Sequence, residues 1–115
     1  MIPNEVVIAL GSNIEPEENL ELAVVALKSK FKVSKMSRWI RTKPFGILDQ
    51  PDFFNGVLIM VTELGIESLK QELKSVEDLM GRDRSKPKFG PRIIDLDILI
   101  WNGKVIDKDY YDRDF

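Results

Sequence analysis

Near the end of the chain stands FGPRIIDLDILI, residues 89–100, an Ile- and Leu-rich run typical of a buried strand that also carries two aspartates. Because successive side chains of a strand turn to opposite faces, Asp95 and Asp97 share one face, with their Cα atoms about 6.5 to 7 Å apart. Ionised carboxylates beside apolar surface are costly unless a partner neutralises them. A Mg²⁺ ion shared with substrate phosphates is one such partner. Pairing with nearby arginines, or exposure of the strand at a sheet edge, is the alternative.

A strongly basic loop precedes this strand. Residues 81–92 hold five basic residues and one acid, in a chain whose net charge is −2. A concentrated positive field in an acidic protein favours a small polyanion such as a triphosphate over a nucleic acid, which needs a broad basic surface. A solvated charged turn is the alternative for a loop of this composition.

Apolar spacing upstream of the loop predicts a βαββαβ order. In the first helix, Leu20, Ala23, Val24 and Leu27 recur at i, i+3, i+4 and i+7 and form an apolar stripe. The expected elements are a strand at 5–10, a helix at 16–30, a polar edge strand at 32–41, a long loop at 43–52, a strand at 54–62, a helix at 66–80 and a strand at 94–101. This order is typical of the α+β class, as a ferredoxin-like βαββαβ sandwich with an antiparallel sheet and two helices on one face. The other face is then left for a ligand.

The composition is that of one folded domain over residues 1–115, with 43% hydrophobic and 31% charged residues. The sequence has no cysteine and no histidine, which excludes disulfides, thiolate metal sites and imidazole bases. Any catalysis would therefore depend on metal ions, cations and positioning. We see no signal-peptide pattern and no apolar stretch of about 18 residues, so we expect a cytoplasmic protein. A P-loop motif is absent, which argues against a P-loop NTPase.

Three motifs resemble those of a known family, the 6-hydroxymethyl-7,8-dihydropterin pyrophosphokinases of folate biosynthesis. They are ALGSN at residues 9–13, DQPDFFN at residues 49–55, and GPR followed by DLD within residues 90–97. The resemblance covers nearly the whole chain. It implies Mg²⁺-dependent transfer of pyrophosphate from ATP to 6-hydroxymethyl-7,8-dihydropterin with release of AMP, and two Mg²⁺ ions bridged by Asp95 and Asp97.

The resemblance also implies roles for individual residues. The catalytic group that it implies is Arg82, Arg92, Asp95 and Asp97, with the two aspartates as metal ligands. The implied ATP contacts are Lys74, Arg84 and Arg113, and Glu77 is expected near the metal as a supporting carboxylate. The implied pterin contacts are Thr42, Pro44, Phe45, Phe53, Asn55, Phe89 and Phe115, together with the backbone around Gly46.

The chemistry of the residues supports part of this assignment. A pterin needs an aromatic side chain for stacking and an amide that both donates and accepts, and Phe53 and Asn55 supply these on one face of a strand. Core packing is the alternative for Phe53. For Glu77 the alternative is an exposed position in the last turn of a helix, where the helix dipole disfavours an acid.

The sequence departs from the family pattern in several places. Lys74 stands where an amide is expected, Phe89 stands where tryptophan is usual, and the family's Pro-His segment after the fourth strand is absent. Arg113 and Phe115 align with an Arg-x-Phe of the family. Family members usually continue past this point with a further strand and helix, so we expect a short form that lacks this extension, by natural reduction or by truncation.

Two other classes of function stay open at this stage. One is a catalytically weak or inactive relative that binds ATP or the pterin. The other is an interaction module or RNA-binding domain of similar topology, although the fourth strand offers aspartates where RNA stacking needs aromatic residues. The expected partners are ATP and the pterin, without nucleic acid or membrane, and the expected state is a monomer, with an oligomer left open.

Overall fold

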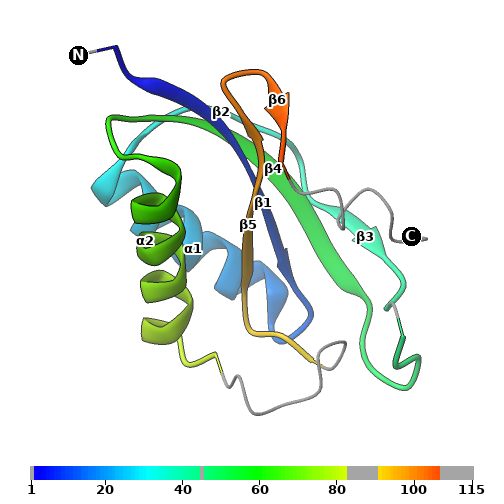
Figure 1. Cartoon of the computed structure of the whole chain (residues 1–115). Helices are drawn as coiled ribbons and strands as arrows, with labels where there is room; N and C mark the ends of the chain where they lie inside the picture. The colour runs from blue at the N-terminus through cyan, green and yellow to red at the C-terminus, as the bar shows by residue number, and fades with distance from the viewer. Residues whose placement is uncertain (1, 45, 83–90, 107–115) are drawn as a thin grey trace.

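The chain folds into an open antiparallel sheet with two helices packed on one of its faces (Figure 1). A computed structural model describes residues 2–44, 46–82 and 91–106. The helices and strands are, in chain order, β1 (Asn4–Ser12), α1 (Pro16–Lys30), β2 (Lys32–Met36), β3 (Ile40–Thr42), β4 (Phe53–Thr62), α2 (Ile66–Leu79), β5 (Asp95–Trp101) and β6 (Lys104–Val105).

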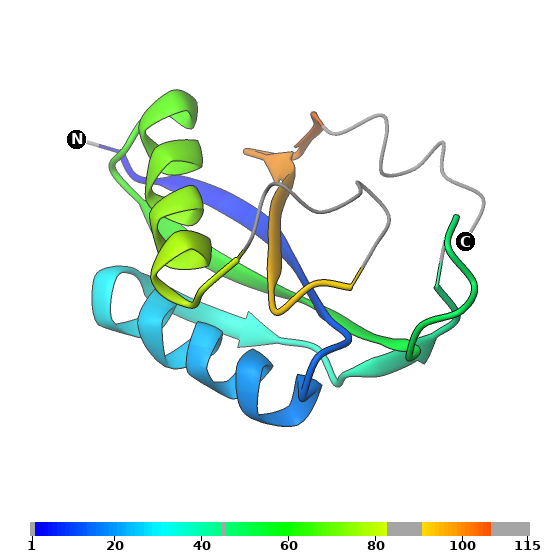
Figure 2. The same cartoon turned by 90° about the horizontal axis from the view of Figure 1, so that it is seen from below.

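The strand order confirms the ferredoxin-like prediction. The sheet runs β2-β4-β1-β5-β6, and β3 pairs with β4 off this path. Each pair is antiparallel, and β1 lies in the centre between β4 and β5. Figure 2 shows α1 and α2 side by side on the same face of the sheet, and in the described part of the chain no helix lies on the other face. This side is the open face of the sheet.

The core fills the space between the sheet and the helices. Val6, Ile8 and Leu10 of β1 are at most 1% exposed and point toward the helices. The predicted stripe of α1 is confirmed, because its four apolar residues are all buried. In α2, which lies within the helix predicted at 66–80, the buried apolar residues are Leu69, Leu73 and Val76, spaced as one face of a helix. Gly81 follows this helix with φ of +91°, a conformation that favours glycine at a helix end.

The prediction of one edge strand over residues 32–41 was wrong, because the structure divides this segment into β2 and β3. A register shift lies between Val33 and Lys35. At Ser37 the hydroxyl, instead of a backbone carbonyl, accepts the N–H of Val57 at 2.9 Å. The ladder is therefore interrupted, and Trp39 turns in to pack against the core.

The short strand β6 was not predicted. It pairs with the end of β5 through a turn at Asn102 and Gly103, whose φ angles are +49° and +83°. An Asn-Gly pair with two positive φ angles is the usual signal for a tight hairpin turn. The Asn-Gly signal was present in the sequence, and the hairpin adds one short strand to the edge of the sheet.

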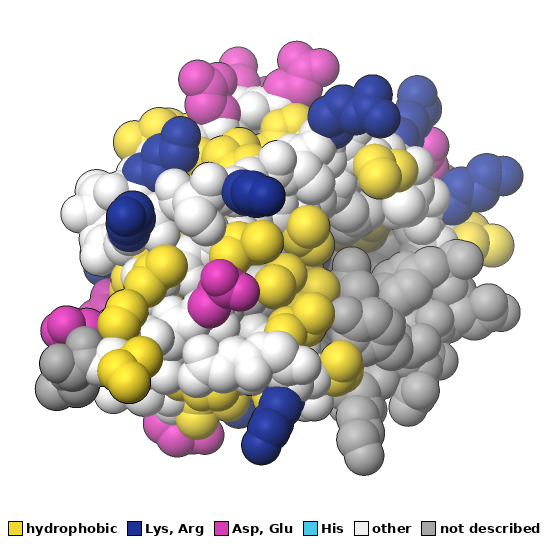
Figure 3. All heavy atoms as spheres, turned by 90° about the horizontal axis from the view of Figure 1, so that it is seen from above, with side chains coloured by type: hydrophobic (Ala, Val, Ile, Leu, Met, Phe, Trp, Pro, Cys, Tyr) yellow, Lys and Arg dark blue, Asp and Glu magenta, His cyan; other side chains and the backbone are white. Residues whose placement is uncertain are grey.

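The end of the molecule away from loops 43–52 and 91–94 has a mixed surface. Figure 3 shows hydrophobic side chains gathered there among basic and acidic ones. Neither helix of the described part of the chain is long and apolar enough to cross a membrane.

Trp39 lies so close to Gly56 that a side chain at this glycine has no room. A Cβ atom built on Gly56 would be 2.5 Å from Trp39 Cε3 and 2.9 Å from Ser37 Oγ. We therefore expect Gly56→Ala to lower the free energy of unfolding by about 1–3 kcal/mol, because a rigid ring must move. Urea denaturation followed by circular dichroism measures the change.

Gly65 provides the control for this substitution. A Cβ atom there meets nothing within 4 Å, and its φ is −75°. Gly65→Ala should cost less than about 1 kcal/mol, the usual penalty for alanine at a helix N-cap. In the Gly56→Ala background, Trp39→Leu should cost less than it does alone, and strictly additive effects would refute the proposed clash.

Candidate active site

Two rows of paired residues cross the open face of the sheet. In the first, Asn55 of β4, Gly11 of β1 and Asp95 of β5 are direct strand partners. In the second row the partners are Val57, Ala9 and Asp97. Direct partners point to the same side of a sheet. Because Leu96 and Ile98 belong to the core on the helix side, both aspartates lie on the open face, as strand alternation predicts.

Glycine in the first row has a steric reason. A Cβ atom on Gly11 would come within 2.7 Å of Asn55 Oδ1. The amide of Asn55 therefore lies over the backbone of β1 and leans toward the strand that separates it from Asp95. A larger residue at position 11 would displace this amide.

Thr42, Phe53 and Asn55 meet on the open face. Thr42 of β3 is the strand partner of Phe53, and Asn55 Nδ2 donates a hydrogen bond to Thr42 Oγ1 at 2.5 Å. Phe54 points to the helix side and packs against the core, whereas Phe53 points to the open face. The core alternative for Phe53 was therefore wrong. Pro44, two residues after Thr42, is buried, and Gly46 has φ of +84°.

Asp95 is bound by an arginine of the basic loop. Arg82 Nη1 lies 2.9 Å from Asp95 Oδ1 and 2.8 Å from Glu77 Oε2. The pairing with an arginine that the sequence left open is thus present for Asp95. The Arg82 side chain is 16% exposed, and its Nε is buried with no hydrogen-bond partner in the part of the chain that the structure describes.

Glu77 is 4% exposed, which rules out the alternative of an exposed glutamate, and its predicted role near the metal stays a prediction. Its Oε2 accepts the backbone N–H of Leu96 at 2.7 Å. This N–H lies at the edge of β5 that β1 does not cover, so the carboxylate satisfies a strand donor as well as pairing with Arg82. These two partners offset the unfavourable position of an acid at the end of α2.

Asn13 was not among the predicted site residues, yet it belongs to the first quoted motif and bonds to residues of the other two. It follows β1 directly and is 2% exposed. Its Oδ1 accepts the backbone N–H of Arg92 at 2.8 Å, and its own N–H donates to the Arg92 carbonyl at 3.1 Å. Its Nδ2 donates to Gln50 Oε1 at 2.8 Å and to the Pro51 carbonyl at 3.0 Å. Each of these partners belongs to one of the three quoted motifs, but the contacts between the motifs appear only in the folded structure.

The remaining predicted residues divide into two groups. Arg92 is buried at the start of the segment that leads into β5, and Lys74 is exposed on α2, one turn before Glu77. The others lie outside the described residues: Phe45, Arg84, Phe89, Arg113 and Phe115.

The carboxylates of the open face fit a magnesium ion that is shared with a ligand. Within residues 2–44, 46–82 and 91–106, no group of three or more Asp, Glu, His or Cys side chains could hold a metal by itself. Magnesium keeps several waters and usually binds through one or two carboxylates together with substrate phosphates. Asp95 and Asp97 are a donor set of this kind.

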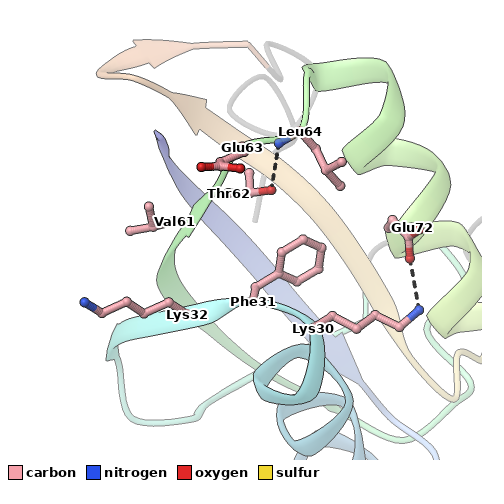
Figure 4. A pocket seen from close by; sticks show the side chains of 8 residues that line it. All are labelled: Lys30, Phe31, Lys32, Val61, Thr62, Glu63, Leu64 and Glu72. Atoms are coloured by element: carbon pink, nitrogen blue, oxygen red, sulfur yellow. Dashed lines mark hydrogen bonds and ion pairs between the residues drawn. The ribbon is translucent and has the colours of Figure 1, made fainter. Parts of the chain in front are cut away.

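A hollow of about 500 Å³ at the other end of β4 is a poor alternative site. Figure 4 shows side chains from the ends of α1 and β4 and from α2 around it, with Lys30 bonded to Glu72. Thr62, in its wall, lies roughly 30 Å along β4 from Phe53. The hollow is lined by both lysines and glutamates, so it has no concentrated positive charge for a phosphate. An ion pair of 2.9 Å also joins Lys30 to Glu72. The buried polar network is at the opposite end.

The fold and these side chains define the class of the protein: a ferredoxin-like α+β domain with carboxylates and an amide on its open sheet face, beside an arginine-bearing loop. Within this class, the chain belongs to the 7,8-dihydro-6-hydroxymethylpterin-pyrophosphokinase (HPPK) family, whose model matches residues 7–115.

Bacterial proteins named 2-amino-4-hydroxy-6-hydroxymethyldihydropteridine pyrophosphokinase are similar over most of the chain. The Haemophilus influenzae protein is 38% identical over 105 residues, which cover 89% of this chain and 65% of that protein. The Bacillus subtilis protein is 37% identical over 103 residues, covering 87% and 61%. The Synechocystis protein is 35% identical over 105 residues, covering 89% and 53%. The chain thus spans between about half and two thirds of the length of these relatives.

Glu77 makes a testable contribution to stability. Glu77→Ala leaves Arg82 without one carboxylate and the Leu96 N–H without its acceptor, so we expect a loss of about 2–4 kcal/mol in the free energy of unfolding. Glu77→Gln keeps an acceptor for the N–H and should lose less. Urea denaturation of both variants measures these changes.

Glu72 is the matched control on the same helix. It pairs with Lys30 at 2.9 Å, but both side chains are about 40% exposed. Glu72→Ala should therefore cost less than about 1 kcal/mol. Equal losses from Glu72→Ala and Glu77→Ala would contradict the role given to the buried carboxylate.

Proposed function

We propose that this chain transfers pyrophosphate from ATP to 6-hydroxymethyl-7,8-dihydropterin, with Mg²⁺, and releases AMP. The observation that carries the proposal is the row of Asn55, Gly11 and Asp95 on the open face. Two strand spacings separate the amide from the carboxylate, about 10 Å. An amide suited to a pterin edge and a carboxylate suited to magnesium therefore face one side of the sheet, with only glycine between them. Family membership and the names of the bacterial relatives support the same reaction.

Asn55, Thr42 and Phe53 would bind the pterin. The bonded pair of Asn55 and Thr42 is fixed before any ligand arrives, so the Asn55 Oδ1 acceptor is already oriented. The Phe53 ring stands on the same face and offers a surface for stacking. Asp95 and Asp97 would hold Mg²⁺, which when bound neutralises phosphate charge and makes the pterin hydroxyl more acidic.

The reaction needs charge neutralisation and alignment more than covalent chemistry. The hydroxymethyl oxygen would form a bond to the β-phosphorus while the bond from this phosphorus to the oxygen of the α-phosphate breaks, and the hydroxyl proton would pass to solvent. Arg82 places a guanidinium 2.9 Å from Asp95, close to where phosphate charge would gather. We assign Arg82 and Arg92 to the phosphates, in line with the bidentate chemistry of arginine. Lys74, Arg84 and Arg113 remain proposed ATP contacts.

A catalytically weak or inactive relative that binds ATP or the pterin is the second candidate. It is supported by two departures from the family pattern, Lys74 where an amide is expected and Phe89 where tryptophan is usual. Binding of both ligands without AMP release would identify this candidate. Cytoplasmic action, where ATP and the reduced pterin are available, is part of the first proposal.

The direct test is AMP release from ATP. We expect AMP only when both Mg²⁺ and 6-hydroxymethyl-7,8-dihydropterin are present. Asp95→Asn and Asp97→Asn should each lower turnover by about 100-fold or more, because charge neutralisation at the phosphates is lost. The control is Glu63→Gln, an exposed acid at the far end of the molecule, which should keep the rate of the unchanged protein. Near-normal turnover in either aspartate variant would remove the metal assignment.

Asn55→Ala tests the pterin assignment separately. It removes the only amide of the first row, so we expect KM for the pterin to rise about ten-fold and KM for ATP to stay within about two-fold. Asn19, whose amide bonds the Ile14 carbonyl beside α1, serves as control, and Asn19→Ala should leave both values unchanged. An equal rise of both KM values in Asn55→Ala would contradict the assignment.

A further inference from the structure

The side chain of Asn13 connects the two halves of the proposed site. Its partner Pro51 lies two residues before Phe53, at the entry to β4, and its partner Arg92 lies three residues before Asp95, at the entry to β5. The pterin-binding residues of β4 and the carboxylates of β5 are therefore tied to one amide at the end of the central strand.

The chemistry of this position requires an amide. The Oδ1 atom accepts from the Arg92 N–H, while the Nδ2 atom donates to two oxygens, of Gln50 and of Pro51. Asparagine is the short side chain that offers an acceptor and two donors in one plane, whereas aspartate only accepts. At 2% exposure, water does not replace a lost partner easily.

The loop before β4 is linked to this amide as a unit. Gln50 Nε2 also donates to the Ile47 carbonyl at 2.6 Å, so residues 47–51 are linked to one another as well as to Asn13. Arg92 is held from both sides, because Asn13 also donates its backbone N–H to the Arg92 carbonyl. One amide thus bonds to both the loop before β4 and the segment before β5.

We infer that Asn13 is a positioning residue. It holds the loop before β4 (residues 46–52), next to the proposed pterin contacts, and the segment before β5 (residues 91–94), next to the proposed phosphate contacts, at the spacing that in-line transfer requires. Asn13 would contact neither ATP nor the pterin. The inference rests on the proposed function. A displacement of about 1 Å between reacting groups can lower a rate 100-fold, so a side chain that fixes this spacing contributes strongly without contacting the reacting atoms.

The test uses Asn13→Asp and Asn13→Ala. The aspartate variant keeps the acceptor for the Arg92 N–H but sets a carboxylate against the Pro51 carbonyl. For Asn13→Asp we expect faster amide hydrogen exchange in residues 46–52 with little change in residues 91–94, and weaker pterin binding, about ten-fold, with binding of a non-hydrolysable ATP analogue within about two-fold. For Asn13→Ala both segments should exchange faster, and kcat should fall by about 100-fold.

Asn4→Ala is the matched control, at the opposite end of the same strand. Asn4 also bonds across loops, to the Leu64 carbonyl at 2.9 Å and with Asn102. Asn4→Ala should lower the free energy of unfolding without changing exchange in residues 46–52 or the ratio of the affinities for the pterin and the ATP analogue. Should Asn13→Ala not fold, Gln50→Ala replaces it and should raise exchange in residues 46–52 alone.

The outcomes separate this inference from the proposed function. The exchange measurement needs neither ligand nor activity. If exchange rises selectively in residues 46–52 but the protein releases no AMP, the positioning role of Asn13 is supported and the proposed enzyme activity is refuted. Unchanged exchange in Asn13→Asp, or equal weakening of both ligands there, would overturn the inference and leave Asn13 as a structural residue.

Discussion

The register of β1 between β4 and β5 is the constraint on which the rest of the structure depends. Its apolar side chains alternate, so that Val6, Ile8 and Leu10 face the helices and the residues between them face the open side. A slip of one residue would exchange the two sets and place Gly11 in the core. The same register that builds the core therefore also places Asn55 and Asp95 in one row.

Helices and long strands could be predicted from the sequence because their signals are local. The stripe of α1 and the apolar run of β5 are read from spacing within one segment. The division of residues 32–41 could not be read in this way. It depends on Gly56, which lies in another strand and opens the space that Trp39 occupies, and a pairwise steric relation of this kind has no periodic signature.

The candidate site was predictable to the same extent. The shared face of Asp95 and Asp97 follows from strand alternation alone. The burial of Glu77 does not, because its carboxylate is stabilised by the Leu96 N–H and by Arg82, two partners brought together only when α2 meets β5. The role of Asn13 likewise becomes visible only when three separate segments converge on it.

The distribution of buried polar groups gives an argument for the site that does not depend on relatives. Among the described residues, five polar or charged side chains are buried: Ser12, Asn13, Thr62, Glu77 and Arg92. All except Thr62 lie at the end of the sheet where β1 finishes and β5 begins. Burying such groups is costly unless they are bonded, and an apolar core would have been an easier way to stabilise that end. A network that fixes loop positions there is best explained by chemistry that needs those positions.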